Sequence, residues 1–245
     1  QLNKSFGEVS LNIPEFTQVG EDLSDLVGQY GNDVEALTEA TQKVMTVIDA
    51  EAYIERSIEA FKQSLDVYNQ LRWPTENATV HVNLGIAYAL LSQMKQKMTN
   101  IRKAISEFKT GVEYFASERY PLSYSIIMNN IGVAYYYLSD FGDVEELLAK
   151  SRKALAMACE ELEDKGYRGY LYEVKLNEMR IRHQVEAMAV VRARAFSPEE
   201  KKERLKELRE RFAEEEKALV KPETPDQFAS YEIEFMLLGV GTMKL

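Results

Sequence analysis

The sequence is poor in the residue types that most often carry chemistry. Its 245 residues include one cysteine, one tryptophan and two histidines. The lone Cys159 excludes an internal disulfide and any cysteine-rich metal site. Its Ala- and Leu-rich surroundings favour a buried small hydrophobe over a reactive thiol. His81 and His183 lie far apart and form no His-x-x-x-His or Glu-x-x-His pair for a metal. Catalysis needs converging groups, so we expect no enzyme, no catalytic residue, no metal and no cofactor.

Long hydrophobic runs are also missing. The most apolar stretch, residues 185–191, is too short and too closely flanked by charge to span a bilayer. No secretory hydrophobic region opens the chain. The glycines at 239 and 241 precede no helix, which argues against a phosphate-binding loop. We therefore expect a protein in the reducing cytoplasm.

Acidic residues outnumber basic ones, and the formal net charge is −10. Residues 1–52 hold ten acids and two lysines, so this segment carries −8 of that charge. An acidic surface disfavours nucleic acid and anionic membranes as partners. We expect a protein or peptide partner and leave self-association open. The predicted domains are an acidic arm (1–31), a helical repeat domain (32–220) and a C-terminal tail (221–245).

The chain repeats itself at an interval of 47 residues. Residues 53–92 align with 100–139 without a gap, and twelve of these forty positions are identical. The best-matched block is Asn-Leu-Gly-Ile-Ala-Tyr at 83–88 against Asn-Ile-Gly-Val-Ala-Tyr at 130–135. A third copy is weaker: residues 152–155 match 102–105 at a spacing of fifty, which predicts a slightly longer loop near Gly142. An ungapped match of this length indicates a true internal repeat.

Each unit is predicted to contain two helices. Apolar residues at 54, 58, 61, 65 and 68 follow helical spacing, as do 101, 105, 108, 112 and 115. Proline at 74 and 121 ends one helix and suits the first turn of the next. A glycine inside the second helix, at 85 and 132, predicts close approach by a neighbouring helix. The expected helices are 33–50, 52–71, 76–98, 100–118, 122–138, 144–164, 168–195 and 198–220.

The two ends of the chain lead to separate expectations. Ser197, Pro198 and two glutamates predict a helix start, and the helix that follows is expected to cover the end of the stack. The apolar tail 231–238 must dock on something. The arm 1–31 is too poor in apolar residues for a core, so it is either disordered or extended along the body. We hypothesise that it docks on a repeat surface, with Phe16 as its main anchor.

The Leu-Gly-x-x-Tyr block, together with Ala104 and Phe108 in a partner helix, resembles the tetratricopeptide repeat, in a form longer than the usual 34 residues. The resemblance implies an all-α fold in which antiparallel helix pairs stack into a right-handed superhelix. It also implies a concave groove that holds a peptide or an extended segment of a partner. By this resemblance Leu84, Gly85, Tyr88, Ile131, Gly132 and Tyr135 are packing residues.

The residue before the Leu-Gly pair faces the groove in this family, and an asparagine there commonly bonds the ligand's backbone. The partner-binding residues that the resemblance implies are Asn83, Asn130, Ile86, Val133, Leu90 and Tyr137. For Tyr137 the sequence favours packing and ligand contact equally. The lysines and arginines with which the chaperone-binding branch grips a carboxylate are absent: Val82, Ile86, Asn129 and Val133 stand there. A chaperone tail is therefore not the expected ligand.

A basic set on the predicted 168–195 helix has two readings. It is either a solvated face paired with the glutamates of 199–216 or a receptor for an acidic segment. Its members are Arg180, Arg182, His183, Arg192 and Arg194.

For the whole chain, a scaffold or adaptor that binds proteins is the expected function. The alternatives are an architectural subunit of a larger assembly and a ligand-responsive regulator.

Overall fold

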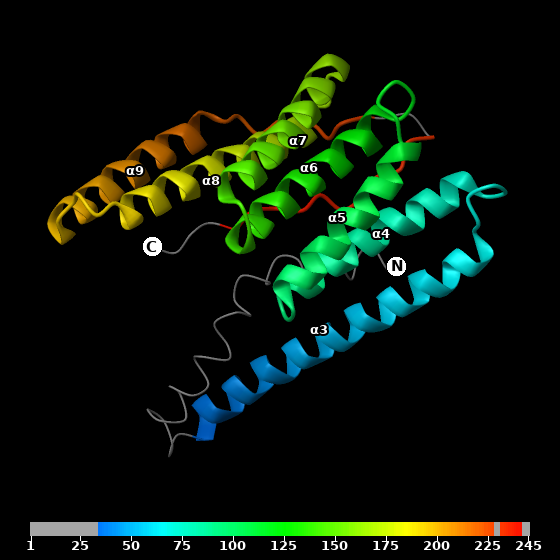
Figure 1. The fold of residues 1–245 in the computed structure, drawn as a ribbon, viewed down its shortest axis with the longest axis horizontal. Coiled ribbons are helices and arrows are strands. Elements are labelled where there is room, and N and C mark those ends of the chain that lie inside the picture. Colours follow the sequence, from blue (N-terminus) through cyan, green and yellow to red (C-terminus); the bar gives the residue numbers. More distant parts are fainter. Residues whose placement is uncertain (1–33, 228–230, 242–245) are drawn as a thin grey trace. The chain divides into compact units, whose positions relative to one another are not determined.

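The computed structural model describes residues 34–227 and 231–241, with side chains from Asp49 onward. Within these ranges the secondary structure is seven α-helices and one short 3-10 turn, and no described residue lies in a strand (Figure 1). The elements are α3 (Val34–Val67), α4 (Pro74–Ser92), α5 (Lys97–Tyr114), α6 (Pro121–Leu138), η1 (Ser139–Phe141), α7 (Val144–Lys165), α8 (Arg168–Arg192) and α9 (Pro198–Ala218). The expected all-α class is confirmed. The arm 1–31 lies outside the described residues, so its docking stays a prediction.

The chain divides into two compact units between Tyr114 and Phe115. In the first unit α3 packs on α4, and α4 packs on α5. In the second unit α6 packs on α7, α7 on α8 and α8 on α9. The predicted repeat domain 32–220 thus extends over both units. None of the helices in the described ranges is long and apolar enough to cross a membrane.

Helix starts show the repeat more clearly than the sequence did. Helices α4, α6 and α8 begin at Pro74, Pro121 and Arg168, at successive intervals of 47 residues. Proline fits the first position because its missing N–H has no helical partner there. Helices α5 and α7 begin at Lys97 and Val144, again 47 apart. The repeating unit therefore starts at the glycine-bearing helix and includes the helix after it, rather than the helix before it.

The two helix glycines each face a neighbouring helix, as predicted. A Cβ at Gly85 would lie 2.5 Å from Cδ1 of Phe108 on α5, and a Cβ at Gly132 would lie 2.8 Å from Cγ of Leu155 on α7. Both pairs are 23 residues apart in the chain. Leu155 therefore corresponds to Phe108 at a spacing of 47, and the match of 152–155 to 102–105 at fifty is wrong. The loop before α7 needs no extra residues.

Two predicted helices merge into one. Helix α3 is continuous where the sequence predicted a boundary between 33–50 and 52–71. The residues at the expected boundary, 48–53, include neither proline nor glycine, and two alanines there favour helix.

Helix α9 begins with the predicted cap. The Ser197 hydroxyl accepts the Glu200 N–H at 3.2 Å, and the Glu200 carboxylate accepts the Ser197 N–H at 2.7 Å.

Candidate functional site

An extended segment of the chain's own C-terminus lies along α6 and α8 in the second unit (Figure 1). We call residues 231–241 the tail segment. It contacts Ser123 near the start of α6 through Ile233, and its last residue, Gly241, contacts Gln184 on α8. The expectation that the apolar tail docks is confirmed. The surface of α6 and α8 is therefore occupied by a segment of the same chain.

Asn130 on α6 pairs with the main chain of this segment. Its side-chain Nδ2 donates to the carbonyl of Met236 at 2.9 Å, and its Oδ1 accepts the N–H of Leu238 at 2.8 Å. Asn130 is fully buried. One amide side chain thus replaces the donor and acceptor that a neighbouring β-strand would present. The tetratricopeptide resemblance implied that Asn130 bonds a partner's backbone; here it bonds the chain's own segment, and partner binding stays a prediction.

Two further asparagines extend the pairing along the segment. Asn129 and Asn177 both donate to the carbonyl of Leu238, at 3.0 and 2.9 Å. Asn177 Oδ1 accepts the N–H of Val240 at 2.9 Å. Asn177 also donates to Asn129 Oδ1 at 2.9 Å, and Asn129 donates to Asn130 Oδ1 at 3.1 Å. All three amides are buried, and each has both its oxygen and its nitrogen engaged, so the network fixes their orientation.

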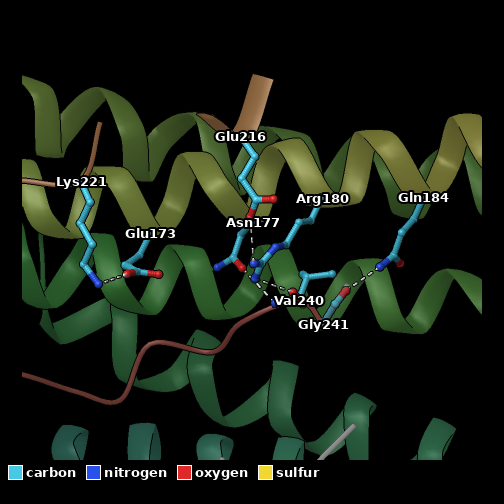
Figure 2. Close-up of polar contacts among 8 residues, drawn as sticks. All are labelled: Glu173, Asn177, Arg180, Gln184, Glu216, Lys221, Val240 and Gly241. Carbon is cyan, nitrogen blue, oxygen red and sulfur yellow. Dashed lines mark hydrogen bonds and ion pairs between the residues drawn. The ribbon is translucent and has the colours of Figure 1, made fainter. Parts of the chain in front are cut away.

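The far end of the segment is held from α8, as Figure 2 shows for Val240 and Gly241. Arg180 Nη1 donates to the Val240 carbonyl at 3.1 Å, and Gln184 Nε2 donates to the Gly241 carbonyl at 2.8 Å. The buried hydroxyl of Tyr136 donates to Gln184 Oε1 and so turns the amide nitrogen toward the tail. Burial raises the pKa of Tyr136 further above neutral pH.

The segment also completes the start of α6. The N-cap residue Tyr120 makes no side-chain cap bond. Glu232 takes that role: its carboxylate accepts the N–H groups of Leu122 and Ser123, both at 3.2 Å, and lies 2.8 Å from the Ser123 hydroxyl. Glu232 is buried, and a carboxylate at a helix N-terminus is stabilised by the free N–H groups and the helix dipole.

Helix α8 is completed in the same manner. Its N-cap residue Tyr167 makes no side-chain cap bond. Asp226, on the linker that leads to the tail segment, accepts the N–H groups of Gly169 and Tyr170 at 2.8 and 3.0 Å. The C-terminal region therefore supplies one carboxylate to each of the two helices that bind it.

Apolar contacts are concentrated at two tail residues. Phe235 is buried, and its ring meets the ring of Phe115 edge to face at a centroid distance of 5.3 Å. Val240 is also buried, at 1% exposure. Between them Gly239 is exposed, and the side chains of Leu237 and Leu238 are half-buried. Among the apolar side chains of the tail segment, Phe235 and Val240 are therefore the fully buried ones.

One carboxylate of the segment reaches a tyrosine on α8. The Tyr170 hydroxyl donates to Glu234. Burial, followed by this bond to a carboxylate, raises the pKa of Tyr170. Tyr137 on α6 is half-buried, and its hydroxyl meets the main chain of Gly241. Burial raises the pKa of Tyr137, and the Gly241 contact partly offsets that effect.

Two arginines of the predicted basic set pair with glutamates of α9, and one of these two also binds the tail segment. Arg180 and Arg182 pair with Glu216 and Glu215 of α9, at 3.4 and 2.5 Å. Arg180 in addition binds the tail, so α9 orients a residue that holds the tail segment. His183 stacks on Phe212 of α9 at a ring distance of 4.4 Å, and burial lowers its pKa. The predicted pairing with the glutamates of 199–216 is confirmed for Arg180 and Arg182.

The six predicted partner-binding residues fall into two groups. Asn130, Val133 and Tyr137 lie on α6, where Asn130 and Tyr137 contact the tail segment and Val133 is buried. The other three lie on α4 of the first unit: Ile86 and Leu90 are buried and Asn83 is half-buried. Within the described residues no side-chain hydrogen bond involves Asn83. A groove shared by Asn83 and Asn130 stays a prediction, because the two residues belong to different units.

Several site residues escaped prediction. They are Ser123, Asn129, Asn177, Arg180, Gln184 and the carboxylates Asp226 and Glu232. A signal existed for Asn177, which follows Asn130 by 47 residues although no Leu-Gly pair follows it. Arg180 was predicted as a member of a basic face, without its carbonyl partner. The two carboxylates gave no signal, because helix capping by a distant segment leaves no local pattern.

The first unit shows a different polar contact on the equivalent hairpin. His81 Nδ1 on α4 lies 2.7 Å from Glu107 Oε2 on α5.

Cys159 on α7, in the second unit, is half-buried rather than fully buried, and burial raises the pKa of its thiol to about 11. No group of three His, Cys, Asp or Glu side chains suited to a metal occurs within the described ranges.

No family model, curated protein or solved structure matches the chain.

Proposed function

We propose that this chain is a helical-repeat adaptor that holds an extended segment of another protein on α6 and α8. The tetratricopeptide resemblance and the stacked, superhelical arrangement are parts of the same proposal. One observation carries it: five side chains of α6 and α8 bind the main chain of an extended segment at Met236, Leu238, Val240 and Gly241. Those side chains are Asn129, Asn130, Asn177, Arg180 and Gln184.

Recognition of main-chain atoms suits an adaptor. Every peptide offers N–H and C=O groups at regular intervals, so donors and acceptors aimed at them bind any extended segment whose side chains fit. Selectivity then comes from the few positions at which side chains are buried. On α6 and α8 the three asparagine amides also bond one another, Asn177 to Asn129 and Asn129 to Asn130, which holds them in the binding orientation and lowers the entropy cost of binding.

The repeat gives further support. Hairpins α4–α5 and α6–α7 share their helix starts, their glycine contacts and the asparagine before the Leu-Gly or Ile-Gly pair. Stacked units of this kind build continuous binding surfaces because each repeat presents the same face. An adaptor also agrees with the absence of converging catalytic groups from the sequence.

The proposal can be tested by selecting peptides on the protein. A display library of random peptides of about twelve residues is panned on the full-length chain carrying Phe235→Ala, which weakens the resident tail segment. We expect enriched peptides that bind with micromolar affinity or better. The same panning on a chain that carries Phe235→Ala and Asn130→Ala should enrich none of them.

A matched control is available in the first unit. Asn83→Ala, combined with Phe235→Ala, changes the asparagine at the equivalent repeat position and should leave the enriched peptides bound. Circular dichroism and thermal melting establish that each variant is folded. The adaptor function would be contradicted if the same peptides were enriched on the Asn130→Ala chain, or if several libraries gave no enriched peptide.

A further inference from the structure

The tail segment has the features of a replaceable ligand. Its main chain is bound by side chains of other elements at Ile233, Met236, Leu238, Val240 and Gly241. None of these hydrogen bonds involves a side chain of the tail segment. A different extended segment with suitable anchors would make the same bonds, because the groups they reach are present in every peptide.

The link to the rest of the protein is also loosely held. Between the end of α9 at Ala218 and the tail segment, Val220 is 83% exposed and residues 223–225 are exposed. In the described part of this linker, Asp226 bonds the start of α8, and Lys221 lies 3.8 Å from Glu173 and 5.9 Å from the centre of the Tyr172 ring. The pair of Lys221 and Glu173 is shown in Figure 2. Release of the tail segment would therefore leave the connection to α9 intact.

The positions at which the tail segment is buried define what can replace it. Glu232 fills the N-terminus of α6, Phe235 packs on Phe115, and Val240 is enclosed. The segment thus presents a carboxylate, an aromatic ring three residues later and an aliphatic side chain five residues after the ring. Each position favours one type of group: free N–H groups favour the carboxylate, and burial favours an apolar side chain at the other two.

We infer that the tail segment is an intrachain competitor that blocks the α6–α8 surface until a partner displaces it. The partner is a protein with an extended segment carrying the same order of groups, a carboxylate, an aromatic and an aliphatic residue at the spacing of Glu232, Phe235 and Val240. This inference rests on the proposed function and adds the identity of the competing ligand. A tethered segment is present at an effective concentration in the millimolar range, so a partner must bind strongly or be abundant.

The test begins with the full-length chain in which residues 220–224 are replaced by a protease site. After cleavage, the complex is mixed with an excess of isotopically heavy synthetic peptide of residues 225–245. Native mass spectrometry then follows exchange of the light fragment for the heavy peptide. We expect exchange within hours, while the protein remains folded by circular dichroism. A heavy peptide with Glu232→Gln and Phe235→Ala is the matched control and should exchange at least tenfold less at equal concentration.

A second measurement uses the chain without cleavage. A fluorescent peptide of residues 225–245 is titrated with the full-length protein, either wild type or carrying Phe235→Ala. The variant should bind the peptide at least tenfold more tightly, because its own tail competes less well. Equal affinity for both chains, or a cleaved fragment that never exchanges, would overturn the inference. A dimer in which each copy holds the other's tail would overturn the choice of partner, and native mass spectrometry detects it.

The two proposals fail separately. If the tail fragment does not exchange but panning on the Phe235→Ala chain still enriches peptides, the inference of an intrachain competitor is wrong and the proposed adaptor function is kept. If the fragment exchanges but panning enriches no peptide, the tail is replaceable and the adaptor function falls.

Discussion

The hairpins α4–α5 and α6–α7 are built from the same repeat but present different polar surfaces. Each has proline at the first helical position, a glycine against a side chain 23 residues later, and an asparagine two residues before that glycine. In the second hairpin Asn130 is buried and bonded to an extended segment. In the first hairpin Asn83 is half-buried, and the residue beside it is Val82 where the second has Asn129.

The difference shows that packing and binding are specified by different positions. The glycine contact depends on two residues of one hairpin and recurs wherever both are present. The main-chain pairing is made by Asn129, Asn130 and Asn177, and these come from two repeats. The asparagine of the repeat motif therefore makes only part of the pairing.

Filling either glycine contact should destabilise the fold as much as any other single substitution. Gly85→Leu and Gly132→Leu should each lower the free energy of unfolding by about 1–3 kcal/mol, because the added side chain meets Phe108 or Leu155. Gly85→Leu should cost more, since the Cβ site is closer to a rigid ring. Urea unfolding measures both. An unchanged midpoint for Gly132→Leu would show that α6 and α7 are not in close contact.

The asparagine pair should give the clearest difference between the hairpins. Asn130→Ala leaves the Met236 carbonyl and the Leu238 N–H without their partner and should cost about 1–3 kcal/mol. Asn83→Ala should stay within about 0.5 kcal/mol of wild type. Hydrogen exchange adds a local readout: protection of the Leu238 amide should fall in Asn130→Ala alone. Equal effects of the two substitutions would remove the distinction between the hairpins.

A smaller effect is expected from the carboxylate that caps α6. Glu232→Gln keeps the shape but removes the charge, and should cost about 0.5–1 kcal/mol. In the first hairpin Glu76 lies in the first turn of α4, whose N-cap residue Trp73 also makes no side-chain cap bond. Glu76→Gln should cost less, because Glu232 alone is buried against two N–H groups. Thermal melting at low salt compares them, and a larger loss for Glu76→Gln would contradict the role of the tail.

The smallest effect concerns the histidine of the second unit. Burial lowers the pKa of His183 in the folded protein. The unfolded chain therefore binds a proton more readily, and this contribution to stability is present above about pH 6.5 and is lost as pH falls below it. His183→Gln should flatten part of the fall in stability between pH 7 and pH 5. A variant with the same pH slope as wild type would show that another group causes the fall.

The sequence alone determined the helical class, the 47-residue period, the helix start at Pro198, the starts of α4 and α6 to within two residues, and the inward-facing glycines. These features are local, because proline, glycine and apolar spacing act within one helix or between neighbours in the chain. It also selected Asn130 through a family resemblance. The boundary predicted near residue 51 was wrong because helical spacing alone does not mark where a helix ends.

Only the tertiary structure decided what Asn130 binds. The tail segment lies more than a hundred residues further along the chain, and its carboxylate Glu232 caps a helix that has no side-chain cap of its own. Such contacts join main-chain atoms to distant side chains, and main-chain atoms are the same in every residue. Their pairing therefore leaves no pattern in the sequence and depends on where folding places the tail segment.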